Sequence, residues 1–79
     1  MLNHIVEKFE REASEFCRKE IRLTERSFYS GEQKSYYKKL VVDGKETRHH
    51  IDIFQLQEAN ARGKLHEKVR RVAGLLILS

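Results

Sequence analysis

Four basic side chains flank the dipeptide Asp43-Gly44: they are Lys38, Lys39, Arg48 and His50. Side chains of this kind contact phosphate groups, and a nearby aromatic ring such as that of Tyr37 can hold an unstacked base. If the chain folds back on itself at Asp43-Gly44, the basic side chains gather on one surface. The pattern therefore predicts a surface that binds a polyanion.

The same residues have a second interpretation. Lysine and arginine on a sheet face that is open to solvent also discourage pairing between sheet edges. A two-residue turn would place Lys39 opposite Arg48, and two like charges in that position repel unless an anion or a nearby carboxylate relieves them. The sequence leaves the polyanion surface and the solvated face open as alternatives.

A second group of cations lies near the C-terminus: it consists of Arg62, Lys64, Lys68, Arg70 and Arg71. Only Glu67 offsets them in this segment. We predict that Lys64, Lys68 and Arg71 contact phosphate groups. The alternative is the solvated face of an amphipathic helix, with cations near the helix C-terminus where the helix dipole favours them.

The histidines suggest metal chemistry. The run Arg48-His49-His50-Ile51-Asp52, followed by Asn60 and His66, resembles the motif of HNH-type nucleases. That resemblance implies His50 as the base that activates water, with Asp52 and His66 as ligands of a divalent ion. However, a second metal ligand is expected four residues after His66, and that position holds Arg70. We therefore predict no catalytic residues, metal or other cofactor. Cys17 falls on an apolar helix stripe, where cysteine behaves as a small hydrophobe.

The elements that position these residues follow from hydrophobic periodicity. Apolar residues recur at helical spacing from Leu2 to Cys17 and predict a helix over about residues 3–19. Residues 20–29 change to a period of two and predict a strand, although a helix that continues to about Arg26 is the alternative. A second helical stripe runs from Leu56 to Leu76, with Gly63 as its weak point.

The dipeptide Asp43-Gly44 lies between two β-rich runs and predicts a hairpin with a type I′ turn. This turn pairs Val42 with Lys45, Leu40 with Thr47, Lys38 with His49, and Tyr36 with Ile51. One face of the hairpin then forms part of the core: it carries Tyr36, Leu40, Val42, Ile51 and Ile53. The opposite face carries Tyr37, Lys39, Arg48 and His50.

The predicted fold is a single α+β domain over residues 1–79: an N-terminal helix, a two- or three-stranded antiparallel meander and a C-terminal helix. The order α-β-β-β-α resembles that of double-stranded RNA-binding domains, which recognise duplex shape. The resemblance ends at this order, because the second helix opens with the neutral to acidic residues 55–60 instead of a lysine cluster.

Composition narrows the class of protein. The chain of 79 residues has a net charge of +4 and a pI near 9.4, which favours polyanionic partners. The single cysteine excludes a disulfide within the chain, and together with the absence of an apolar signal core it predicts a cytoplasmic protein. No stretch approaches the roughly 20 apolar residues that would span a membrane.

A domain of this size has a small core, so we predict that a homodimer adds burial. The predicted interface side chains come from both helices: they are Phe9, Phe16, Leu75, Leu76, Ile77 and Leu78. We thus expect a non-enzymatic binding or regulatory module that contacts nucleic acid, or a protein that handles nucleic acid, with no small-molecule substrate. The alternatives are a protein-interaction or inhibitor module that uses these apolar side chains, and an HNH-like nuclease.

Overall fold

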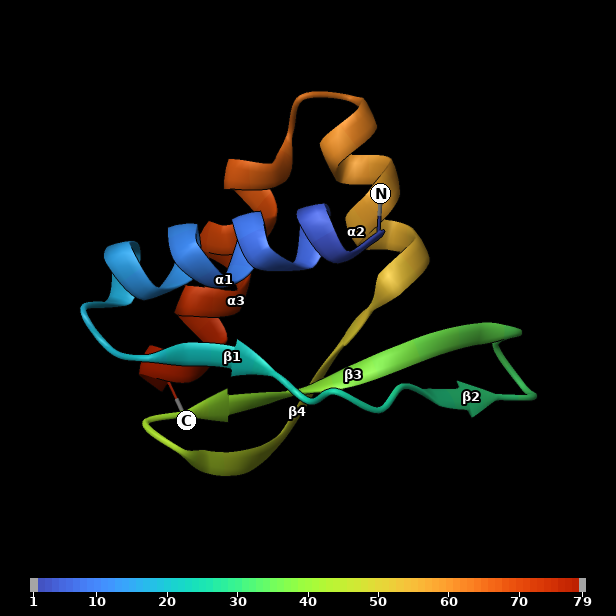
Figure 1. Ribbon diagram of the computed structural model, residues 1–79, viewed down its shortest axis with the longest axis horizontal. Coiled ribbons are helices and arrows are strands. Elements are labelled where there is room, and N and C mark those ends of the chain that lie inside the picture. Colours follow the sequence, from blue (N-terminus) through green and yellow to red (C-terminus); the bar gives the residue numbers. More distant parts are fainter. Residues whose placement is uncertain (1, 79) are drawn as a thin grey trace.

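The computed structural model describes the backbone of residues 2–78 and the side chains of residues 4–76. The predicted interface side chains of Ile77 and Leu78 lie outside this range. The elements follow in the order α1 (Leu2–Cys17), β1 (Ile21–Leu23), β2 (Phe28–Ser30), β3 (Ser35–Val42), β4 (Lys45–Asp52), α2 (Ile53–Ala61) and α3 (Leu65–Leu78). In Figure 1 the strands form a lower layer and the helices gather above it, which confirms the predicted α+β class.

Helix α1 buries Phe9 and Ala13 of the predicted stripe in the core, whereas Phe16 of the same stripe is exposed. Two of its polar side chains also bind the backbone of β1. The Ser14 hydroxyl accepts a hydrogen bond from Ile21 N (2.9 Å) and donates one to Ile21 O (3.2 Å), while Glu10 Oε2 accepts one from Leu23 N (2.8 Å). These bonds satisfy backbone groups of a strand at the edge of the sheet, so α1 covers part of that edge.

The sheet is antiparallel and is centred on β3. Strand β4 pairs along one side of β3, and β1 and β2 both pair along the other side. The predicted strand over 20–29 is therefore present, in two pieces, and α1 does not continue to Arg26. Between the pieces the first strand holds four residues, 24–27, against only two residues of β3, 38–39.

The predicted turn at Asp43-Gly44 is confirmed. Both residues have positive φ angles, 50° and 80°, as a type I′ turn requires. The Asp43 carboxylate accepts a hydrogen bond from Glu20 N (3.1 Å), and Asp43 N donates one to Glu20 O (2.9 Å). The turn is thus tied to the segment that links α1 and β1.

The predicted register of this hairpin is correct only next to the turn. Val42 pairs with Lys45, but Lys39 pairs with His50 and Lys38 with Ile51, because β4 contains two extra residues at this point. The expected pairings of Lys39 with Arg48, Lys38 with His49, and Tyr36 with Ile51 are wrong. The reason is local: the Thr47 hydroxyl donates to Leu40 O (2.8 Å) and accepts from His49 N (3.2 Å), which satisfies the backbone inside a bulge.

The core face of the hairpin matches the prediction except at the two tyrosines. Leu40, Ile51 and Ile53 are buried, whereas Tyr36, expected in the core, is exposed. Tyr37, expected on the open face, keeps only 8% of its surface exposed. Tyr36 lies at the start of β3, on the part of the sheet that extends beyond the helices in Figure 1, and so no helix covers it completely.

The predicted single C-terminal helix is wrong, because the chain turns between α2 and α3. Asp52 begins α2: its carboxylate accepts hydrogen bonds from Phe54 N (2.8 Å) and Gln55 N (3.1 Å). The helix ends at Ala61, and the turn after it contains Gly63, whose φ of 70° lies in the left-handed region that glycine tolerates best. Gly63 N donates to Asn60 O (3.0 Å), and α3 then starts in a new direction.

The core lies between α1, the sheet and the two C-terminal helices. It contains Phe9, Leu40, Leu56 and Val69 among its buried members. The side chain of Phe9, predicted as an interface residue, is completely enclosed within the core of the described chain. Across residues 2–78, no helix combines the length and apolar character needed to cross a membrane.

Candidate polyanion site

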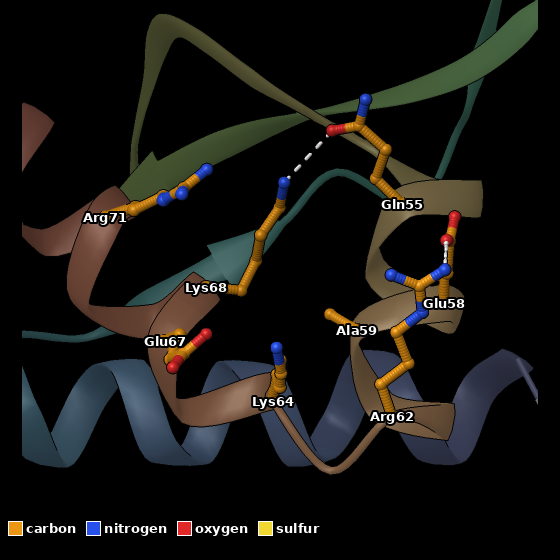
Figure 2. A pocket seen from close by; sticks show the side chains of 8 residues that line it. All are labelled: Gln55, Glu58, Ala59, Arg62, Lys64, Glu67, Lys68 and Arg71. Atoms are coloured by element: carbon orange, nitrogen blue, oxygen red, sulfur yellow. Dashed lines mark hydrogen bonds and ion pairs between the residues drawn. The ribbon is translucent and has the colours of Figure 1, made fainter.

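A hollow of about 450 Å³ lies between α2 and α3, next to the turn at Gly63. Figure 2 shows the side chains that line it: Gln55, Glu58, Ala59, Arg62, Lys64, Glu67, Lys68 and Arg71. Four of these eight residues are cations and two are carboxylates. The hollow thus carries a net positive charge on a concave surface.

Lys64, Lys68 and Arg71, the cations that the sequence predicted as phosphate contacts, all line this hollow. Their spacing of four and three residues places them along one face of α3 and the turn before it. Lys68 occupies the middle of the hollow in Figure 2, and its ammonium donates a hydrogen bond to Gln55 Oε1 (3.0 Å) across the gap. Because that partner is a neutral amide, the positive charge of Lys68 stays uncompensated by this contact.

Arg62 lines the opposite wall and has a carboxylate partner. Its guanidinium lies 2.7 Å from Glu58 Oε1, one helical turn earlier in α2. Both side chains are largely exposed, and ion pairs of this kind are weak and screened by salt. A phosphate group could therefore compete with Glu58 for the Arg62 guanidinium at little cost.

The sheet cations do not form one open patch. The Lys38 ammonium donates to two backbone carbonyls of the first strand, Thr24 O (2.7 Å) and Glu25 O (2.6 Å). Lys39 Nζ lies 3.5 Å from Glu46 Oε1 and forms an ion pair with it. Lys38 thus satisfies backbone groups inside the fold, and the charge of Lys39 is partly compensated.

Arg48 and His50, the other two predicted sheet residues, are exposed on β4. His50 makes edge contacts with two rings: its centroid lies 4.9 Å from that of Tyr37 and 5.7 Å from that of Phe28. Phe28 also stacks on Tyr37 at 5.8 Å. The rings on this face therefore pack mainly on one another.

Tyr37 is further fixed by its hydroxyl, which donates a hydrogen bond to Gln33 Oε1. Burial of the Tyr37 side chain raises the pKa of its hydroxyl above the ordinary value, and the nearby Asp52 carboxylate raises it further. The hydroxyl therefore stays protonated at neutral pH. It acts as a hydrogen-bond donor within the fold.

The residues of the HNH-like resemblance lie in three different environments. His50 packs on the sheet aromatics, Asp52 caps α2, and His66 lines a separate hollow with Phe16 and Val69 between α1 and α3. Within the described part of the chain, no three histidine, cysteine, aspartate or glutamate side chains gather as a metal site.

Cys17 is half-buried at the end of α1. Burial raises the pKa of its thiol above the ordinary value, and Lys19 opposes this increase only in part. The reactive thiolate form is therefore less abundant than for an ordinary exposed cysteine.

Sequence reasoning missed part of the hollow, because it treated α2 and α3 as one helix. The wall supplied by Gln55, Glu58, Ala59 and Arg62 faces the α3 cations only after the chain turns. The sequence did contain one signal for that turn. Gly63 lies directly before Lys64, and glycine commonly follows the last residue of a helix.

We also compared the chain with models of protein families, with curated proteins and with solved structures. None of the three comparisons gave a match.

Proposed function

We propose that this protein is a non-enzymatic binding module that holds nucleic acid through phosphate contacts in the hollow between α2 and α3. The observation that supports this proposal is the position of Lys64, Lys68 and Arg71 around one concave surface. Cations that are spread over a convex surface point away from one another and do not contact the same ligand together. Cations that line a hollow instead act together on one ligand.

The chemistry of the hollow favours phosphate over a single carboxylate. Arg62 and Arg71 each offer a planar fork of N–H donors that matches two phosphate oxygens, and Lys64 and Lys68 add point charges. Contacts with phosphate fix the position of a nucleic acid without reading its bases. We therefore expect affinity with little dependence on base sequence.

The test is a salt titration with a fluorescent oligonucleotide, read by anisotropy. With three or four phosphate contacts, the logarithm of the binding constant should fall with the logarithm of the salt concentration with a slope of about −2 to −4. The triple variant Lys64→Ala/Lys68→Ala/Arg71→Ala should lose most of this binding and reduce the slope.

The control removes the same charge elsewhere. Lys8, Arg11 and Lys19 are exposed and do not line the hollow, so their triple alanine variant has the same net charge as the first variant. If both triple variants lose the same affinity for the oligonucleotide, binding depends on the net charge of the protein and not on the hollow. Absence of salt-dependent binding in the wild type would disprove the proposal.

We further propose self-association through the exposed apolar side chains of α1 and α3. Phe16 and Leu75 are 56% and 52% exposed, and this observation favours the predicted homodimer over a monomer. Sedimentation velocity of the wild type and of Phe16→Ser/Leu75→Ser tests it. A wild type that stays monomeric at concentrations of about 100 μM would contradict this proposal, since a dimer with an ordinary Kd near 1 μM forms there.

A further inference from the structure

Three aromatic side chains form a continuous exposed surface at the end of the sheet: Tyr29, Tyr36 and Phe54, called the aromatic patch here. The ring centroids of Tyr29 and Tyr36 are 5.1 Å apart, and those of Tyr36 and Phe54 are 6.1 Å apart. Yet the three side chains remain 55%, 46% and 51% exposed. The rings contact one another and still leave about half of their surface open to a ligand.

The aromatic patch begins on the same helix that forms one wall of the hollow. Phe54 directly precedes Gln55, whose amide accepts the Lys68 hydrogen bond, and Glu58 follows one turn later on the same side of α2. Four residues of helix correspond to about 6 Å along the axis. Phe54 therefore lies within about one helical turn of Gln55 and Glu58, two residues of the wall that the Lys68 side chain contacts.

The position of Phe54 is fixed by the start of α2. Its backbone N–H donates to the Asp52 carboxylate at 2.8 Å, and Ile53, its neighbour, is buried in the core. Tyr36 and Tyr29 are paired across β3 and β2. The patch thus rests on a sheet and a capped helix, and a ligand would meet rings that are already ordered.

We propose that the aromatic patch stacks the unpaired bases of a single-stranded nucleic acid whose phosphates lie in the hollow. This inference rests on the proposed function. Aromatic rings bind any base through its π-face, and a duplex hides those faces inside its stack. A duplex can use only the cations of the hollow, whereas a single strand uses both the cations and the rings.

The other ring cluster is less suited to this role. Tyr37 keeps only 8% of its surface exposed and its ring contacts Phe28 and His50, so Phe28, 41% exposed, is the large ring of that cluster that stays open. Lys39, the nearest predicted sheet cation, is already paired with Glu46. Phe28→Ala is therefore a suitable control, because it removes an exposed ring from the opposite side of the sheet.

The experiment compares a labelled single strand of mixed sequence with the same strand in a duplex, at one low salt concentration. We expect the wild type to bind the single strand at least about tenfold more tightly, given the usual contribution of base stacking. Tyr29→Ala/Phe54→Ala should lower that affinity by about tenfold or more and leave duplex affinity unchanged. Phe28→Ala should change neither affinity.

Three outcomes would overturn the inference. Equal binding of both oligonucleotides by the wild type leaves the phosphate contacts valid and removes the stacking role. A loss of single-strand affinity in Phe28→Ala, and not in Tyr29→Ala/Phe54→Ala, moves the stacking to the other face. A double variant that instead becomes monomeric, while the wild type is a dimer, identifies the patch as an interface between copies. If neither oligonucleotide binds, the proposed function itself fails.

Discussion

Replacement of Lys38 by methionine tests whether this side chain stabilises the fold. Methionine keeps the length of the side chain and removes the ammonium. Lys38 is one of the two residues of β3 that lie against four residues of the first strand, 24–27. Without the ammonium, Thr24 O and Glu25 O lose the hydrogen bonds that it donates.

The expected loss follows from these two bonds. Hydrogen bonds to a charged group contribute about 1.5–3 kcal/mol each where water is excluded. Lys38 is half-buried and its bond to Glu25 lies near solvent, so water replaces part of the lost interaction. We expect a decrease of about 2 kcal/mol in the free energy of unfolding, and roughly 8–16 °C in Tm for a domain of this size.

The adjacent residue provides a matched control. Lys39→Met removes the same chemical group, but it breaks only an exposed ion pair with Glu46 at 3.5 Å. Such pairs contribute about 0.5 kcal/mol, so the Tm should fall by at most a few degrees. Thermal unfolding followed by circular dichroism measures both variants. Equal Tm values for Lys38→Met and Lys39→Met would refute the structural role of Lys38.

Two further predictions concern α1. Ser14→Ala removes both hydrogen bonds to the Ile21 backbone, and the free energy of unfolding should fall by about 1–2 kcal/mol, seen as a lower urea midpoint at unchanged slope. The control is Ser27→Ala at an exposed position, which should leave the urea midpoint unchanged. An unchanged urea midpoint in Ser14→Ala would contradict the role of these two hydrogen bonds. Because burial raises the pKa of the Cys17 thiol, less thiolate is present at pH 8, so iodoacetamide should alkylate native protein more slowly than urea-unfolded protein. Mass spectrometry gives both rates, and equal rates would show that burial does not protect this thiol.

The sequence predicted those features that depend on neighbouring residues. Asp43-Gly44 specifies its own turn, because both positions need positive φ and these residue types tolerate it. The stripe of α1 likewise predicted the burial of Ala13. Neither feature needs information from a distant part of the chain.

Other features depend on distant contacts and were not predictable. The shift in register near Leu40 depends on the Thr47 hydroxyl, which replaces a regular backbone pairing, and nothing in the alternation of residues indicates this. Lys38 was read as a surface cation for the same reason: its partners, Thr24 and Glu25, lie 13 or more residues away in the chain. For the hollow, the sequence identified the cations on α3, but not the wall that faces them.

The turn at Gly63 determines how amino-acid substitutions during evolution would affect the hollow between α2 and α3. In an unbroken helix, Gln55 and Lys68 would be about 20 Å apart along the axis, so no space between them could be concave. The turn that contains Gly63 therefore creates the hollow, and a β-carbon at Gly63 would strain the backbone at φ 70°. The cations around the hollow can be exchanged one at a time while the hollow keeps its shape, whereas a change at this glycine would alter the shape of the hollow and the stability of the fold together.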